Sequence, residues 1–135
     1  MPPKGELALL IGNPRAEIKA VRGGITPRQV EVFLEANNFG LKEILKCLAI
    51  SPSSFFHKKK TRAKLNSEMT EKFIRFAHVM KQAEKTLESR DEATAWLHRE
   101  IPSLGDQRPI DLLDTEPGHK LVEQTLLQIE YGVYG

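Results

Sequence analysis

Apolar residues recur at helical spacing over most of the chain, and no stretch shows the period-two alternation of a strand. The clearest run extends from Met69 to Leu87, where Phe73 and Phe76 belong to a stripe with spacings of three and four. Asn66 or Ser67 caps this run, so the pattern predicts one helix of about twenty residues, roughly 30 Å long. The pattern as a whole predicts an all-α protein.

A helix start stands out at Thr26, which caps, with Pro27 at the first helical position and Gln29 completing a capping box. Ile25 and Val30 occupy the positions of a hydrophobic staple. Before Thr26, apolar residues at 7–11 and 18–21 are compatible with a short helix that is broken near Asn13-Pro14 and stopped by Gly23-Gly24.

Two short helices follow, one over Leu41–Leu48 and one that begins at Pro52 with Ser51 as its cap. The tight turn between them is typical of a helix-turn-helix unit. Two positions depart from the usual pattern. Ala49 occupies the turn position that usually takes glycine, and Leu45 stands where a small alanine usually lets the two helices approach.

Short helices and turns alternate after the long helix. Ser89 and Glu92 form a second capping box before a helix that contains Trp96, and residues 101–108 read as a loop. A one-turn helix is expected from Pro109 to Leu113. Thr115 then caps a final helix that runs to about Tyr131.

The charge is distributed unevenly along the chain. Residues 1–88 hold 16 Lys and Arg against 9 Asp and Glu, a net charge of +7, whereas residues 89–135 hold 4 against 9, a net charge of −5. This asymmetry predicts two regions with different partners, a basic region at 1–88 and an acidic region at 89–135.

A basic run lies at the end of the helix that begins at Pro52 and in the loop that follows it. Five positive charges in seven residues bind a polyanion such as DNA by releasing its counterions, and the helix itself is expected to enter the major groove. A solvated basic loop is the alternative. The candidate DNA-binding residues are Ser53, Ser54, His57, Lys58, Lys59, Lys60, Arg62 and Lys64.

The sequence shows no pattern typical of an enzyme, so no catalytic residue, metal ligand or cofactor is expected. The four histidines lack metal-ligand spacing, and Cys47 has no cysteine partner. Asp111 and Asp114 are three residues apart, but a solvent-facing carboxylate and a helix cap explain them. The lone cysteine fits a reducing cytoplasm, and no apolar run approaches the roughly 20 residues that span a membrane.

The chain carries large apolar and aromatic side chains to its end, at Tyr131, Val133 and Tyr134, interleaved with Gly132 and Gly135. Tyrosine is enriched at interface hot spots, so these five residues are candidates for binding a partner protein. Packing against Trp96 or Leu104 of the same chain is the alternative.

The last third of the sequence resembles the toxin-binding domain of the Xre/MbcA/ParS antitoxins, most closely the antitoxin of RES–Xre pairs. The resemblance rests on Trp96-Leu97, Leu104-Gly105, Pro109 to Leu113, Thr115-Glu116, Gly118, Val122 and Gly132-Val133-Tyr134. Asp106 departs from it, because the family usually has a second glycine there.

The resemblance implies an all-α antitoxin in which an Xre-like helix-turn-helix region, residues 1–88, is joined by a long helix to a toxin-binding domain, residues 89–135. Its implied partner is a RES-domain toxin that consumes NAD, encoded by the neighbouring gene in a bacterium, and the antitoxin blocks the toxin's active site. The helical front is expected to form a homodimer that binds operator DNA and represses the promoter. The alternatives are a helix-turn-helix regulator without a toxin and an interaction module that has lost DNA binding.

Overall fold

The computed structural model describes residues 5–132, and these residues form α-helices and 3₁₀-helices with no strand beyond one isolated bridge between Ile101 and Gln107. The all-α fold expected from the sequence is therefore confirmed. The elements in order are α1 (Glu6–Leu10), α2 (Pro14–Gly23), α3 (Pro27–Ala36), α4 (Leu41–Cys47), α5 (Pro52–Thr61), α6 (Ser67–Leu87), α7 (Arg90–Leu97), η1 (Pro102–Leu104), η2 (Pro109–Leu112) and α8 (Glu116–Glu130).

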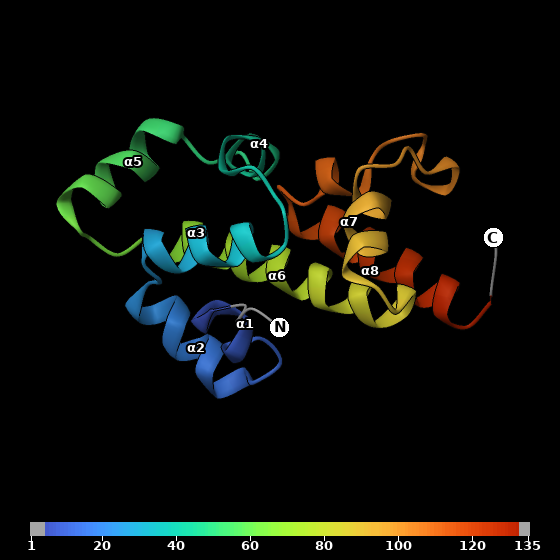
Figure 1. Ribbon diagram of the computed structural model, residues 1–135, viewed down its shortest axis with the longest axis horizontal. Helices are drawn as coiled ribbons and strands as arrows, with labels where there is room; N and C mark the ends of the chain where they lie inside the picture. The colour runs from blue at the N-terminus through green and yellow to red at the C-terminus, as the bar shows by residue number, and fades with distance from the viewer. Residues whose placement is uncertain (1–4, 133–135) are drawn as a thin grey trace.

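The long helix α6 runs through the molecule and contacts α1, α2, α7 and α8 (Figure 1). Helix α5 lies at one end of the molecule, α4 lies between α5 and α7, and the chain leaves α8 at the opposite end (Figure 1). Nine residues of α6 are buried, because an axial helix with neighbours on several sides has little surface left for solvent.

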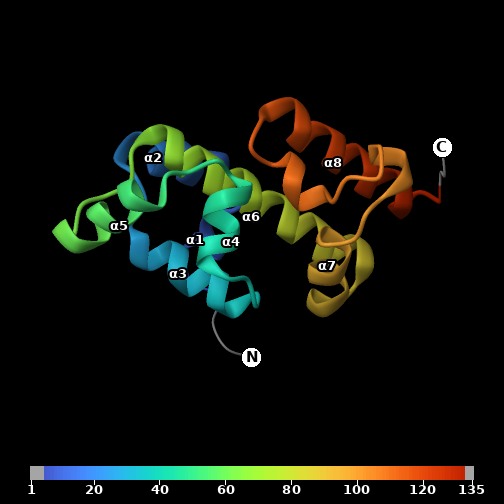
Figure 2. The same ribbon diagram turned by 90° about the horizontal axis from the view of Figure 1, so that it is seen from above.

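One continuous hydrophobic cluster joins the helices on both sides of α6. Phe76 of α6 makes edge-to-face contacts with Phe33 and Phe39, and Phe73 packs beside Phe55 of α5. Seen from above, α3, α4 and α7 lie on one side of α6, and α2 and α8 lie on the other (Figure 2). The core therefore fixes the helix-turn-helix pair and α8 on one common support.

The helix starts are where local side-chain chemistry predicts them. Thr26 and Gln29 form the full capping box, Ser51 accepts from the Ser54 N–H, and Asn66 accepts from the Met69 N–H. Ser89 caps α7 and Thr115 caps α8 in the same way, by accepting the backbone N–H three residues on. These bonds satisfy amide donors that have no partner inside the helix.

The structure adds detail to the sequence prediction in two segments. The N-terminal segment consists of two separate helices, because Asn13 caps α2 and Pro14 begins it. The expected loop at 101–108 contains the 3₁₀-helix η1 and the bridge at Ile101.

The boundary at residues 88 and 89 coincides with a change of helix. Glu88 adopts a left-handed backbone conformation with φ of 56°, which ends α6 before Ser89 caps α7. The assignment of separate functions to the two sides of this boundary stays a prediction.

Across residues 5–132, no helix combines the length and the apolar character needed to cross a lipid bilayer.

Candidate functional site

One face of α8 is covered by exposed side chains that are mostly uncharged, and we call it the α8 outer face. Its apolar members are exposed to 49% at Leu121, 42% at Leu127 and 75% at Tyr131. With 100° between successive residues, the whole set spans about a third of the helix circumference. The α8 outer face consists of Lys120, Leu121, Gln124, Leu127, Gln128 and Tyr131.

The opposite face of α8 is packed against the rest of the protein. Val122 and Leu126 are fully buried, and α8 contacts both α6 and η2. Gly118 lies so close to η2 that a Cβ atom there would be 1.8 Å from the Leu112 carbonyl oxygen. This close approach packs the first turn of α8 tightly against η2, so that the outer face belongs to a helix held firmly against the rest of the protein.

The terminal candidate residues lie where this face ends. Tyr131 is exposed and follows the last residue of α8, and Gly132 is exposed with φ of 68°. Val133, Tyr134 and Gly135 lie outside the described residues. The alternative in which Tyr131 packs into this chain's own core is wrong, because its side chain is largely in solvent.

Leu121 and Leu127 are functional candidates that sequence reasoning missed. In the sequence, Leu121 and Leu127 stand next to the equally apolar Val122 and Leu126, which are buried, and their apolar character alone does not distinguish the two pairs. A helical wheel separates the two pairs: Val122 and Leu126 lie on the buried side of α8, and Leu121 and Leu127 lie outside that side, on the α8 outer face.

His119 lies on the flank of α8 that faces α6. Burial lowers the pKa of His119 below the ordinary 6.5, and the nearby carboxylates of Glu123 and Glu116 only partly oppose this effect. Its Nε2 atom is 2.5 Å from Oε1 of Glu123. The folded protein therefore favours the neutral imidazole more than the unfolded chain does.

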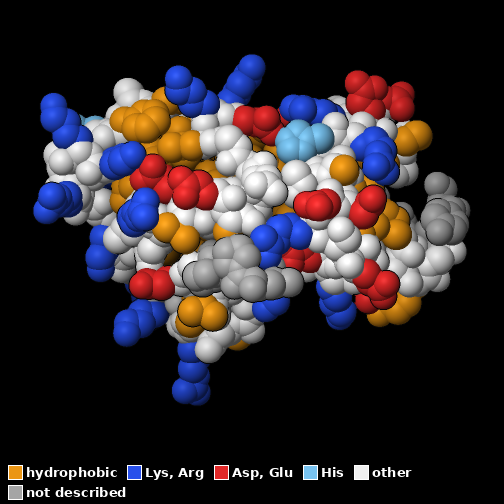
Figure 3. All heavy atoms as spheres, in the orientation of Figure 1, with side chains coloured by type: hydrophobic (Ala, Val, Ile, Leu, Met, Phe, Trp, Pro, Cys, Tyr) orange, Lys and Arg blue, Asp and Glu red, His pale blue; other side chains and the backbone are white. Residues whose placement is uncertain are grey.

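The basic candidate residues gather on and behind α5, at the end of the molecule where Lys and Arg side chains are densest (Figure 3). Lys58 is half-buried, and Lys59 forms a 2.9 Å ion pair with Glu31 of α3. Arg62 has a left-handed backbone that ends α5. The remaining candidates are exposed at Ser53, Ser54, His57, Lys60 and Lys64, as is Arg62.

The helix-turn-helix turn is built without its usual glycine. Ala49 adopts φ of 54°, the left-handed conformation that glycine normally supplies, and Lys72 of α6 donates to the Ala49 carbonyl at 3.1 Å. Leu45 is completely buried at the position where an alanine is usual. The two departures seen in the sequence are therefore real backbone and packing features.

Two side-chain contacts join α4 to the C-terminal part of the chain. The Cys47 thiol donates to Oδ1 of Asp111 at 3.6 Å, and Glu43 lies 2.5 Å from His98 at the end of α7. Arg108 holds Asp111 with two bonds of 2.8 and 2.9 Å.

These contacts explain the pKa values at this junction. Burial, followed by the charge of Asp111, raises the pKa of Cys47 to about 11. Hydrogen bonds from Arg108 hold the pKa of Asp111 below its ordinary value. The Cys47 thiol is therefore protonated and donates a hydrogen bond to the ionised carboxylate of Asp111. In this state the thiol makes a structural contact and is a poor nucleophile.

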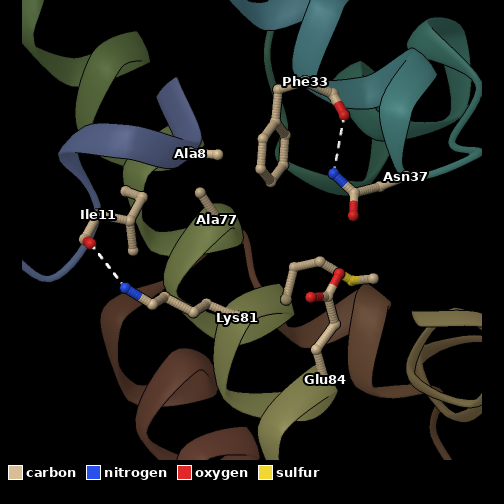
Figure 4. Close-up of a pocket in the computed structure, with 8 residues that line it drawn as sticks. Ala8, Ile11, Phe33, Asn37, Ala77, Lys81 and Glu84 are labelled. Atoms are coloured by element: carbon tan, nitrogen blue, oxygen red, sulfur yellow. Dashed lines mark hydrogen bonds between the residues drawn. The ribbon is translucent and has the colours of Figure 1, made fainter. Parts of the chain in front are cut away.

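A small cavity between α1, α3 and α6 is explained by packing (Figure 4). Its volume is about 90 Å³, and Ile11, Phe33 and Ala77 supply apolar walls. Asn37 donates to the Phe33 carbonyl at 2.9 Å, and Lys81 donates to the Ile11 carbonyl at 2.9 Å. Ligand pockets usually measure roughly 300–1,000 Å³, so this cavity is smaller than a typical ligand pocket.

Within the described part of the chain, no group of three His, Cys, Asp or Glu residues could hold a metal ion.

Comparisons with known proteins bear on the same region. Residues 82–132 match the family model described as the antitoxin Xre/MbcA/ParS C-terminal toxin-binding domain. The chain is 27% identical over 142 residues to the Prs ADP-ribosylating antitoxin of Sphingobium sp. (strain YBL2), covering 98% of this chain and 89% of that protein. It is 30% identical over 111 residues to Antitoxin Xre of Photorhabdus laumondii subsp. laumondii, covering 82% of this chain and 75% of that protein. The matched segment contains the whole α8 outer face.

Proposed function

This chain belongs to the Xre/MbcA/ParS family of antitoxins, and we propose that it neutralises its toxin through the α8 outer face and the terminal residues that follow. The observation that carries the proposal is the exposure of Leu121, Leu127 and Tyr131 on one face of a helix whose other face is buried. Large apolar side chains that are exposed to solvent on one face of a well-packed helix are typical of a protein–protein interface. The face ends at Tyr131, the first residue of the segment 131–135 that we propose enters the toxin's active site.

The proposed toxin is a RES-domain protein that consumes NAD and is encoded by the neighbouring gene. The name of the Sphingobium relative refers to ADP-ribosylation, a reaction whose donor is NAD, and this supports the same cofactor for the toxin. A site that binds the phosphates of NAD presents positive charge, and residues 89–135 of this chain carry a net charge of −5. Opposite charges would speed the encounter and orient the two proteins.

Co-expression with the neighbouring gene tests this function in bacterial cells. The wild-type chain should restore growth, and deletion of residues 131–135 or the change Leu127→Asp should abolish the rescue. Circular dichroism and thermal melting of each purified variant must show that α8 is still folded. Full rescue by both variants would refute the role assigned to this face and to the terminal segment.

We further propose that α5 binds operator DNA as part of a homodimer that represses the promoter of the pair in the bacterial cytoplasm. The exposure of Ser53, Ser54 and His57 on α5 supports a role for them in contacting base edges, and we assign phosphate contacts to Arg62 and Lys64 behind it. Because Lys59 is paired with Glu31, it contributes less to this surface than Lys60 does.

A gel shift against the upstream region tests DNA binding. The triple change of Lys58, Lys59 and Lys60 to Glu should remove the shift, and the single change Lys85→Glu at an exposed position on α6 should not, whereas Lys60→Glu alone should weaken it. Absence of wild-type binding, or binding that survives the triple change, would leave the alternative of an interaction module that has lost DNA binding.

A helix-turn-helix regulator without a toxin is the second candidate function, favoured only by α4 and α5 themselves. It predicts that no product of a neighbouring gene binds this chain in a pulldown.

A further inference from the structure

A second surface, away from the α8 outer face and α5, is built to receive a partner. A groove with a volume of about 510 Å³ opens between α2 and α8 across α6. Both bordering helices lie on the same side of α6 (Figure 2). Ile18 and Val21 of α2 and Ile74 of α6 give the groove an apolar lining.

The helix α2 is the least covered of the longer helices. None of its residues is fully buried, whereas α3, with the same length of 10 residues, buries four. Ile18 is 50% exposed and lines the groove. An amphipathic helix usually buries its apolar side, so α2 presents a surface that a partner can cover.

Charged side chains of both signs line the groove, and two pairs of them are in contact: Glu17 of α2 lies 2.6 Å from His78, and Glu116 of α8 lies 3.8 Å from Arg75. The other exposed charges are of opposite sign on the two sides, with Arg15, Lys19 and Arg22 on α2 and Glu71 on α6. In the part of the chain that the structure describes, the side chains of Arg15, Lys19, Arg22 and Glu71 make no ion pair or hydrogen bond.

Such a surface is complementary to itself. A two-fold axis brings the same patch of two copies together. The basic side of the patch in one copy then meets the acidic side of the patch in the other copy. We propose that this groove is the interface between two copies of this chain. The α2 helix of each copy lies along the groove of the other, with Ile18 against the apolar lining and Arg22 facing the partner's Glu71.

This inference deepens the homodimer included in the proposed function and says where the two copies meet. No residue of α5 or of the α8 outer face lines the groove, so an interface there is compatible with binding of DNA and toxin to the dimer. Its test needs neither toxin nor DNA, and its failure is therefore distinguishable from failure of toxin neutralisation.

A charge-reversal pair tests the interface directly. Arg22→Glu and Glu71→Arg each place like charges face to face in a dimer of identical copies, so each purified variant should sediment as a monomer at concentrations where the wild-type chain is a dimer. In a mixture of the two, every Glu faces an Arg again. Analytical ultracentrifugation of an equimolar mixture should therefore recover a dimer that contains one copy of each variant.

Matched reversals elsewhere provide the controls. Lys60→Glu on α5 and Glu92→Lys on α7 change the same charges at exposed positions away from the groove, and both should remain dimers. Thermal melts of all four variants report whether each is folded. Dimers of Arg22→Glu alone, or a mixture that stays monomeric, would overturn the proposal. So would a wild-type chain that is monomeric by itself and loses toxin affinity on Arg22→Glu, because the groove would then belong to the toxin.

Discussion

The thiol of Cys47 donates to Oδ1 of Asp111 at 3.6 Å, across 64 residues of sequence, and so joins the end of α4 to η2. Because the negative charge of Asp111 adds to burial in raising the pKa of Cys47 to about 11, this contact has a chemical signature. Asp111→Asn should lower the pKa of Cys47 and increase its labelling rate at about pH 9 by roughly threefold to tenfold. Stopped-flow reaction with a disulfide reagent measures the rate.

Glu92→Gln removes a carboxylate from the exposed side of α7 and should leave the rate unchanged. Equal labelling of Asp111→Asn and the wild-type protein would mean that burial alone protects the thiol.

The buried imidazole of His119 predicts a loss of stability in acid. Because the folded state lowers the pKa of His119 below 6.5, the unfolded chain binds the proton more tightly. Stability is therefore fully present above the unfolded pKa and falls as the pH decreases below 6.5. His119→Gln should flatten the dependence of the melting temperature on pH between about pH 8 and about pH 5.5. His57→Gln, at an exposed position on α5, should retain the wild-type slope.

Substitution of two glycines by alanine should change the stability in opposite directions, because Gly118 is closely packed against η2 and Gly23 is not closely packed. Gly118→Ala should destabilise the protein by about 1–3 kcal/mol or more, because its Cβ would overlap the Leu112 carbonyl at 1.8 Å. Gly23→Ala at the end of α2 meets nothing within 4 Å and should stabilise by about 0.5–1 kcal/mol. Urea unfolding measures both, and a neutral Gly118→Ala would show that α8 is not held against η2.

The left-handed turn residue predicts a stabilising change in the helix-turn-helix unit. Ala49→Gly removes the cost of φ at 54° for a residue with a Cβ and should raise the free energy of unfolding by about 0.5–1 kcal/mol. Ala95→Gly, at an exposed position inside α7, should lower it by about 1 kcal/mol. The same sign for both changes would contradict a strained turn at Ala49.

Local chemistry made much of the fold predictable. Thr26 with Gln29, Ser51 with Pro52, and Thr115 each begin a helix where the capping pattern placed it. These signals act over three or four residues, so they can be seen in the sequence without knowing the tertiary structure.

The arrangement of the candidate site was harder to predict from the sequence than the positions of the helices. Leu121 and Val122 are adjacent and both apolar, yet one is exposed and the other buried, because α6 covers only one side of α8. The contact between Glu43 and His98 joins residues 55 positions apart. Such features depend on how helices pack, which periodicity alone does not determine.

The most direct test of the account is the affinity of purified toxin, encoded by the neighbouring gene, for the variants Leu127→Asp and Leu9→Asp, measured by isothermal titration calorimetry. Both leucines are exposed, Leu127 on the α8 outer face to 42% and Leu9 on α1 to 84%. Loss of an apolar contact at the centre of an interface costs about 2 kcal/mol or more, so Leu127→Asp should weaken binding by roughly thirtyfold or more, and Leu9→Asp should bind like the wild-type chain. Equal affinities for the two variants would contradict the α8 outer face as the surface that binds the toxin.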